Sequence, residues 1–239
     1  DDARGLYAYQ ESIAAYLRAL AFLNEMGGYE QTRVLAWKAS AQFALGKLYG
    51  FRGEFVTALE WLAGAKEARA KLEDTAGLAQ VLIETGIALH HKGDYVQVRE
   101  VLNAGLALAR EVGDTRSAAL ALLILGKGAA EIQVDYAAAR TLYEESLGIY
   151  REMGDKVGIS DLLNELGNTA LYQGDYVAAQ ALHEESLSLK REMGNKQGIA
   201  TSFLNLGMGA KAGISISLGN LGLVAWAQGN ITAARELLE

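Results

Sequence analysis

The segment Gly207–Gly213, with the sequence GMGAKAG, has the residue types that could cradle a phosphate group. Glycines let backbone N–H groups approach an anion, and a lysine adds positive charge. A phosphate loop, however, follows a strand and ends in Lys-Ser or Lys-Thr at the start of a helix. No strand pattern precedes this segment, and Ala212 follows Lys211. We therefore interpret it as a junction between repeated units and not as a nucleotide site.

The histidines His90, His91 and His183 are the next candidates, because imidazole can bind metal ions. Adjacent residues on a helix point about 100° apart, so His90 and His91 are poorly placed to share one ion. The chain has no cysteine, and the sequence predicts neither a metal site nor a disulfide. We expect a surface or groove role for one residue of the pair. His183 takes the place of an aromatic packing residue, so we expect it between helices with its polar atoms satisfied.

Two glutamate pairs, Glu144-Glu145 and Glu184-Glu185, could suggest general acid–base chemistry. Such chemistry needs carboxylates that converge on a pocket. These pairs instead recur at one position of a repeat, on the solvated side of the expected second helices. No local motif suggests a Ser-His-Asp or Cys-His arrangement either, so we expect no enzymatic activity and no cofactor.

Composition narrows the class of protein further. The 239 residues carry a net charge of −7 without a Lys/Arg cluster, which disfavours direct binding of nucleic acid. Apolar runs are broken well before the length of a membrane span, and no signal peptide is visible, so we expect a cytoplasmic protein. The chain begins without Met and stops in mid-pattern, and we expect it to be part of a longer protein. Proline is absent, which leaves glycine as the residue to end helices.

A regular sequence repeat organises the chain. Similar triplets begin at Gly53, Gly93, Val134 and Gly174, so the period is about 40 residues. A fixed period of this size indicates stacked helical repeats, and strand patterns are absent, so we predict an all-α chain. The expected helices are Tyr7–Met26, Arg33–Phe51, Glu54–Leu72, Gly77–Lys92, Asp94–Val112, Ser117–Gln133, Asp135–Met153, Gly158–Gln173 and Tyr176–Met193. The expected units are residues 7–30 (second helix only), 31–76, 77–116, 117–157, 158–197, 198–207 (truncated) and 213–239 (partial).

Glycines also recur inside the expected first helices, where each costs about 1 kcal/mol relative to alanine. A repeated cost suggests that a neighbouring helix crosses at that point and leaves no room for a side chain. One extra residue lies between Gly126 and Asp135 compared with the previous unit, and we expect a longer turn or a bulge there. The glycines expected at helix crossings are Gly46, Gly86, Gly126, Gly167, Gly207 and Gly222.

The register of the repeat breaks at residues 207–208. Gly198 opens a unit about 31 residues after the mid-helix Gly167, whereas Gly213 follows Gly207 after only about 6 residues, so about 25 residues are missing from the period. Either the protein has lost this stretch, or the natural chain carries it at this point. We favour the second, since losing most of a second helix would expose apolar faces of its neighbours. An intact mass above 25.6 kDa would support it.

These features resemble the tetratricopeptide repeat, a family with a Leu-Gly, Tyr, Ala, aromatic and small-residue pattern over two antiparallel helices. The period exceeds the usual length of about 34 residues, and the closing proline is missing. The longer variant resembles repeats of bacterial signal-transducing ATPases, LuxR-type regulators and kinesin light chains. The resemblance implies one right-handed solenoid of helix pairs over residues 1–239. The matching residues are Leu163, Leu166, Gly167, Tyr176, Ala179, His183 and Ser186, with Tyr136, Ala139, Tyr143 and Ser146 in the preceding unit.

The resemblance also implies that the first helices line a concave face that binds a protein or peptide. Asparagine can donate and accept hydrogen bonds, which suits binding to a peptide backbone. The alternative is that these positions hold ordinary solvated polar residues. The expected contact residues are Lys47, Gln80, Glu84, His90, Lys127, Asp161, Asn164, Glu165, Asn168, Asn205 and Asn220.

We therefore expect a binding module that serves as a scaffold or sensor segment of a larger bacterial signalling protein. Two alternatives stay open. The chain could be the repeat region of a multidomain ATPase or nucleotide cyclase, or it could resemble a peptide-pheromone receptor. The sequence predicts neither the identity of the partner nor the oligomeric state.

Overall fold

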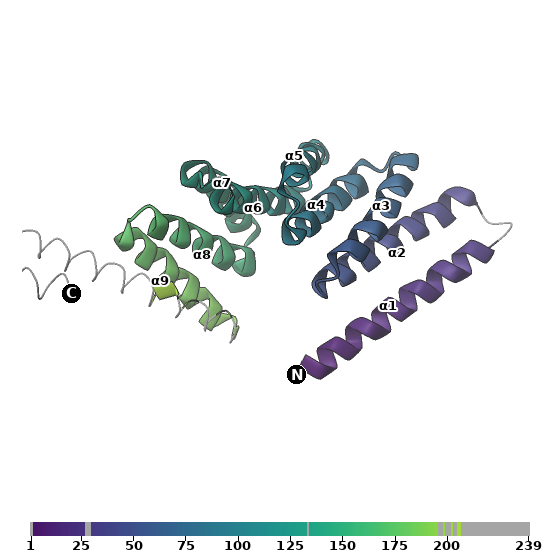
Figure 1. Ribbon diagram of the computed structural model, residues 1–239, viewed down its shortest axis with the longest axis horizontal. Coiled ribbons are helices and arrows are strands. Elements are labelled where there is room, and N and C mark those ends of the chain that lie inside the picture. The colour runs from purple at the N-terminus through teal and green to yellow at the C-terminus, as the bar shows by residue number, and fades with distance from the viewer. Residues whose placement is uncertain are drawn as a thin grey trace, which may run out of the picture. The chain divides into compact units, whose positions relative to one another are not determined.

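The structure is a computed structural model of the chain and describes residues 2–26, 30–132, 134–195, 198, 202, 205 and 206. Every regular element within these ranges is an α-helix, which confirms the predicted fold class (Figure 1). In chain order the elements are α1 (Asp2–Glu25), α2 (Gln31–Phe51), α3 (Phe55–Lys71), α4 (Thr75–Lys92), α5 (Tyr95–Val112), α6 (Thr115–Glu131), α7 (Tyr136–Met153), α8 (Lys156–Tyr172) and α9 (Tyr176–Glu192).

Several first helices begin slightly before the predicted glycines because an aspartate caps them. In α4 the Oδ1 atom of Asp74 accepts a hydrogen bond of 2.8 Å from the backbone N–H of Gly77. Asp155 caps α8 in the same way, at 3.2 Å from the N–H of Gly158. A side-chain acceptor at this position satisfies a backbone donor that the helix leaves without a partner. The other predicted boundaries agree to within two residues, except that α1 begins at Asp2.

Glycine ends several helices, as the absence of proline predicts. Gly93, Gly113 and Gly154 follow α4, α5 and α7 with left-handed φ angles of 85°, 72° and 65°. At the end of α6 this place is taken by Val134, whose φ is 52°. Four residues separate α6 from α7, whereas two separate α4 from α5, so the expected longer turn is present.

The chain forms two compact units, Asp1–Val134 and Asp135–Glu239. In the first unit each helix from α1 to α6 contacts the next, and α4 also contacts α2 and α6. Three first helices, α2, α4 and α6, are thus neighbours in order. In the second unit α8 contacts both α7 and α9. Most of the expected units 198–207 and 213–239, together with the register break at 207–208, lie outside the described residues, so the predicted division into units stays a prediction.

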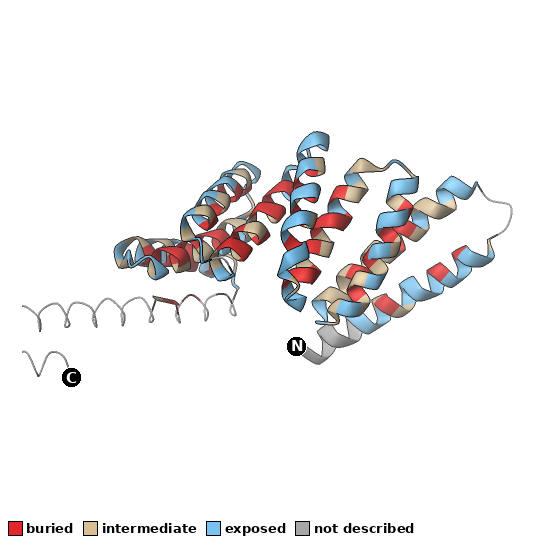
Figure 2. Cartoon of the chain, turned by 45° about the horizontal axis from the view of Figure 1, so that its top comes forward, coloured by how far each residue is buried: buried red, intermediate tan, exposed pale blue. Residues whose placement is uncertain are grey.

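Glycines at helix crossings shape the core, in which each helix buries one side (Figure 2). A Cβ atom on Gly46 would lie 2.6 Å from Cγ of Leu62, and one on Gly167 would lie 2.6 Å from Cε1 of His183. Gly86 meets Leu102 in the same manner. These three positions confirm the prediction of close crossings. Of the others, Gly126 is buried, while Gly207 and Gly222 lie outside the described residues.

Candidate functional site

Two of the predicted contact residues meet between the first helices α2 and α4. Nζ of Lys47 lies 3.1 Å from Oε1 of Glu84, with the two side chains 39% and 19% exposed. Nζ of Lys47 also lies 5.6 Å from the ring centroid of Phe43. The pair therefore presents one donor group and one acceptor group side by side, within reach of a bound molecule.

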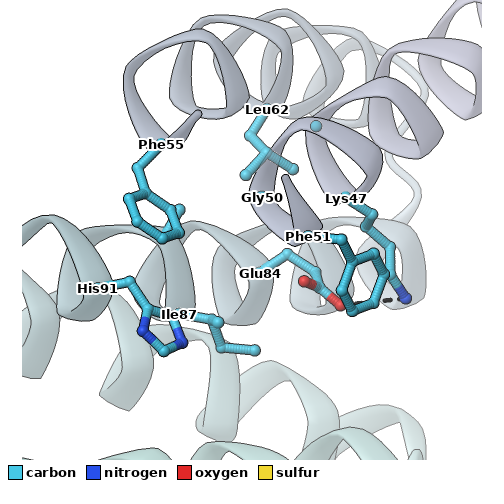
Figure 3. Close-up of a pocket in the computed structure, with 10 residues that line it drawn as sticks. Lys47, Gly50, Phe51, Phe55, Leu62, Glu84, Ile87 and His91 are labelled. Carbon is cyan, nitrogen blue, oxygen red and sulfur yellow. Dashed lines mark ion pairs between the residues drawn. The ribbon is translucent and has the colours of Figure 1, made fainter. Parts of the chain in front are cut away.

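A hollow of about 110 Å³ opens beside this ion pair, between α2, α3 and α4 (Figure 3). One wall is an aromatic stack, in which the rings of Phe55 and His91 lie 5.3 Å apart at an interplanar angle of 13°. The hollow is mostly apolar, so it can accept an apolar group while the rim binds polar atoms. Its lining residues are Gly46, Lys47, Gly50, Phe51, Phe55, Leu62, Glu84, Ile87, Ala88 and His91.

Sequence reasoning missed most of this hollow and selected the other histidine of the pair. His90 is only 8% exposed, and its Nε2 atom lies 3.5 Å from Oε2 of Glu131 in α6. His91 is the exposed residue that lines the hollow. The sequence does contain one indication of the hollow. Gly50 has no side chain, whereas the equivalent residues of the following repeats are His90, Ala130 and Leu171.

Gln80 lies in α4 and helps to fix the start of α6. Its Nε2 atom donates a hydrogen bond of 3.1 Å to Oδ2 of Asp114, the residue that caps α6. Burial would raise the pKa of Asp114, but hydrogen bonds from Ser117 and Gln80 outweigh this effect and hold the pKa below its ordinary value. Gln80 is exposed, so it can still contact a partner while it supports the neighbouring helix.

In the second unit, the structure brings Asn164 and Asn205 together. Nδ2 of Asn205 donates a hydrogen bond of 2.7 Å to Oδ1 of Asn164, so part of the hydrogen-bonding capacity predicted for a partner is used within the protein. Asp161 is exposed on α8, and Glu165 and Asn168 are half-buried there. Lys127, on α6 of the first unit, is also half-buried, and Asn220 lies outside the described residues.

Two basic side chains are buried behind α8. His183 is 1% exposed, and neither ring nitrogen has a hydrogen-bond partner among the described residues, which corrects the expectation of satisfied polar atoms. Burial lowers the pKa of His183, and the charge of Lys190 lowers it further, while Glu165 opposes both. Lys190 is buried too, and burial lowers its pKa, while Asp161 and Glu165 raise it. Burial thus favours the neutral form of this histidine in the folded protein.

The paired glutamates are exposed, as predicted, and they make surface contacts. Oε1 of Glu144 lies 2.8 Å from Nε of Arg140, and Oε1 of Glu185 lies 3.4 Å from Nη2 of Arg151. Within the described part of the chain, no cluster of three or more histidine and acidic side chains could hold a metal ion. Nor does any helix among the same residues have the length and hydropathy needed to span a bilayer.

The comparisons with known proteins agree with this helical-repeat architecture. The family model of the tetratricopeptide repeat matches residues 117–192. No curated protein sequence matches the chain. Among solved structures, the chain is similar to BtubC (BKLC) from P. vanneervenii, with 19% identity, a TM-score of 0.69, and coverage of 97% of this chain and 88% of that one.

Two further structures are similar over nearly the whole chain. One is the Rap conjugation gene regulator of the plasmid pLS20 in complex with the Phr* peptide, with 14% identity, a TM-score of 0.71, and coverage of 100% of this chain and 69% of that one. The other is a signal transduction ATPase with numerous domains from Pyrococcus horikoshii, which has a tetratricopeptide repeat sensor, with 17% identity, a TM-score of 0.64, and coverage of 95% and 42%. Residues 117–192 therefore belong to the tetratricopeptide-repeat family, and the chain as a whole has the helical-repeat fold of these proteins.

Proposed function

We propose that the chain is a peptide- or protein-binding module that uses the exposed faces of its first helices. The observation that carries this proposal is the mostly apolar hollow between α2, α3 and α4, with the Lys47–Glu84 pair at its rim. A concave apolar surface with a few polar groups is the usual form of a binding site. The fold of the chain also occurs in a regulator that was solved in complex with a peptide.

In our proposal the module has no catalytic activity. It serves as the scaffold or sensor segment of a larger bacterial protein in the cytoplasm. The similar ATPase supports this role, because its tetratricopeptide repeats form a sensor and the present chain spans 42% of its length. Asn164 and Asn168 lie on α8, which is also the first helix of its repeat. Together with the other predicted residues of α8, they would form a second set of contacts with the partner.

An affinity-capture experiment tests the function. The chain is immobilised, bound proteins and peptides are identified by mass spectrometry, and affinities of the purified hits are measured by calorimetry. We expect the Lys47→Ala/Glu84→Ala and Asn164→Ala/Asn168→Ala variants to weaken binding of a genuine partner at least tenfold. The control is Gln180→Ala, which removes an exposed side chain from the second helix α9.

Thermal unfolding of each variant guards against loss of fold, which matters for Asn164 because Asn205 donates to it. If both double variants retain the affinity of the wild type for every partner, the first-helix faces do not form the binding site. If no partner of the folded chain is found at all, the binding function itself is refuted.

A further inference from the structure

The hollow between α2, α3 and α4 depends on Gly50, in the last turn of α2. A Cβ atom built on Gly50 would meet no described heavy atom within 4 Å, so this glycine is not required by a helix crossing. Gly46, one turn earlier, does face such a crossing at Leu62. Leu171 occupies the position of Gly50 in the repeat that contains α8. The absence of a side chain at Gly50 therefore leaves a space open beside α2. At the same position of another repeat, the chain carries a larger side chain that can fill such a space.

The walls of the hollow are suited to an apolar group. Phe51 is 70% exposed beside it, and Phe55, Ile87 and Leu62 contribute further apolar surface (Figure 3). The volume of about 110 Å³ is smaller than the roughly 150 Å³ of an engineered apolar cavity that binds benzene. Because this hollow is open to solvent on one side, a leucine or phenylalanine side chain can enter it and cover the exposed face of Phe51.

The rim indicates that the apolar group belongs to a peptide. Lys47 carries three N–H donors and Glu84 carries two acceptor oxygens, so each can make hydrogen bonds beyond their mutual ion pair. A peptide unit offers the complementary set, one C=O acceptor and one N–H donor. A free hydrocarbon or lipid tail would leave this donor and acceptor unused.

We propose that this hollow binds one leucine- or phenylalanine-sized side chain of a peptide partner, while Lys47 and Glu84 bind the adjoining peptide units. This inference rests on the proposed binding function and assigns its anchor to the first unit of the chain. It predicts a partner with an exposed apolar anchor residue flanked by accessible backbone.

The test uses methyl NMR of the full chain, observed at Ile87 and Ala88, with blocked amino acids as probes. We expect N-acetyl-leucine methylamide and N-acetyl-phenylalanine methylamide to shift both signals in a saturable way at millimolar concentration. N-acetyl-glycine methylamide, which lacks the anchor, shifts them at least tenfold less. The variant Gly50→Leu fills the hollow with the residue found at position 171 and abolishes saturation by both probes.

The matched control is Gly148→Leu, because Gly148 is exposed on α7 and, like Gly50, has no described heavy atom within 4 Å of an added Cβ. This variant leaves probe binding unchanged, and thermal unfolding shows that both variants are folded. Probe shifts that persist in Gly50→Leu, or that do not discriminate leucine from glycine, overturn the proposal. So does a monomer–dimer equilibrium that Gly50→Leu abolishes, because the occupant would then be a second copy of the chain.

Failure of this anchor proposal can be distinguished from failure of the proposed binding function. If a captured partner binds Gly50→Leu as tightly as the wild type, the chain is a binding module with its anchor elsewhere. If the probes bind as expected but no partner is captured, the hollow is a competent apolar site and the proposed function fails instead.

Discussion

Glu73 holds a backbone conformation that other repeats assign to glycine. Its φ is 54°, and the corresponding residues Gly113, Gly154 and Gly194 have φ angles of 72°, 65° and 66°. The left-handed region costs a residue with a Cβ atom about 1–2 kcal/mol, although glycine loses more backbone entropy on folding. We therefore expect Glu73→Gly to raise the free energy of unfolding by about 0.5–1 kcal/mol. Urea denaturation measures the difference.

The reverse substitution provides the control for this turn. Gly113→Glu places a side chain at the same repeat position and should destabilise by a similar amount, since no heavy atom of the described residues lies within 4 Å of an added Cβ atom there. A destabilised Glu73→Gly variant would contradict the assignment of strain to residue 73.

His183 is the residue whose burial should make stability depend on pH. Leucine occupies the equivalent place in two earlier repeats, where Leu62 packs against Gly46 and Leu102 against Gly86. Replacing the buried imidazole, whose nitrogens lack hydrogen-bond partners among the described residues, removes a desolvation cost. We expect His183→Leu to stabilise the protein by about 1–3 kcal/mol at pH 5.5.

The sign of the pH dependence follows from the lowered pKa of His183. The unfolded chain binds a proton on this histidine below about pH 6.5, whereas the folded protein binds it only at lower pH. The wild type should therefore lose stability as the pH falls from 7.5 to 5.5, and His183→Leu should lose less. Equal losses in denaturation curves at the two pH values would show that the imidazole is solvated or paired in the native state.

Helix crossings can be tested by comparing glycines in different surroundings. Gly86 in α4 lies against the buried side chain of Leu102, so an added Cβ atom forces the two helices apart. We expect Gly86→Ala to destabilise by about 1–3 kcal/mol. Gly148 in α7 faces open space, so Gly148→Ala should stabilise by up to about 1 kcal/mol through helix propensity alone. Chemical denaturation measures the stability of both variants. If Gly86→Ala is more stable than the wild type, the helix crossing at Gly86 does not exclude a side chain.

The helices could be predicted from the sequence because their signals are local. Aspartates such as Asp74 and glycines such as Gly93 mark the ends, and the period of the chain repeats these signals. The hollow could not be predicted in this way. It depends on the missing side chain of Gly50 and on the stacking of Phe55 with His91, which lies in the next repeat.

The stacking of Phe55 with His91 nevertheless has a counterpart in another repeat. Tyr136 and Tyr172 stack at 5.5 Å with an interplanar angle of 12°, at the same two repeat positions as Phe55 and His91. Both pairs have the same separation in the sequence. Pairs of aromatic residues at this separation therefore predict contacts between successive repeats. The hydrogen bond between Asn164 and Asn205 shows what such sequence patterns do not predict. The sequence predicts both as groove residues, but it does not predict that they bind each other.

At the scale of the whole molecule, stacked repeats should transmit a local defect only to their neighbours. Stability in such arrays is approximately a sum of repeat and nearest-neighbour terms. Helix α4 contacts α2, α3, α5 and α6, whereas α8 and α9 belong to the unit Asp135–Glu239. The strain introduced by Gly86→Ala should therefore lower the free energy of local opening in the first unit and leave the second unit largely unchanged.

Hydrogen–deuterium exchange with peptide resolution measures this distribution. We expect faster exchange in α3, α4 and α5 of Gly86→Ala and wild-type rates in α8 and α9, because amide protection reports local opening. Gly148→Ala serves as the control, since it adds a methyl group without a contact and should accelerate exchange in neither unit. A uniform acceleration across both units of Gly86→Ala would instead mean that the chain unfolds as one cooperative body.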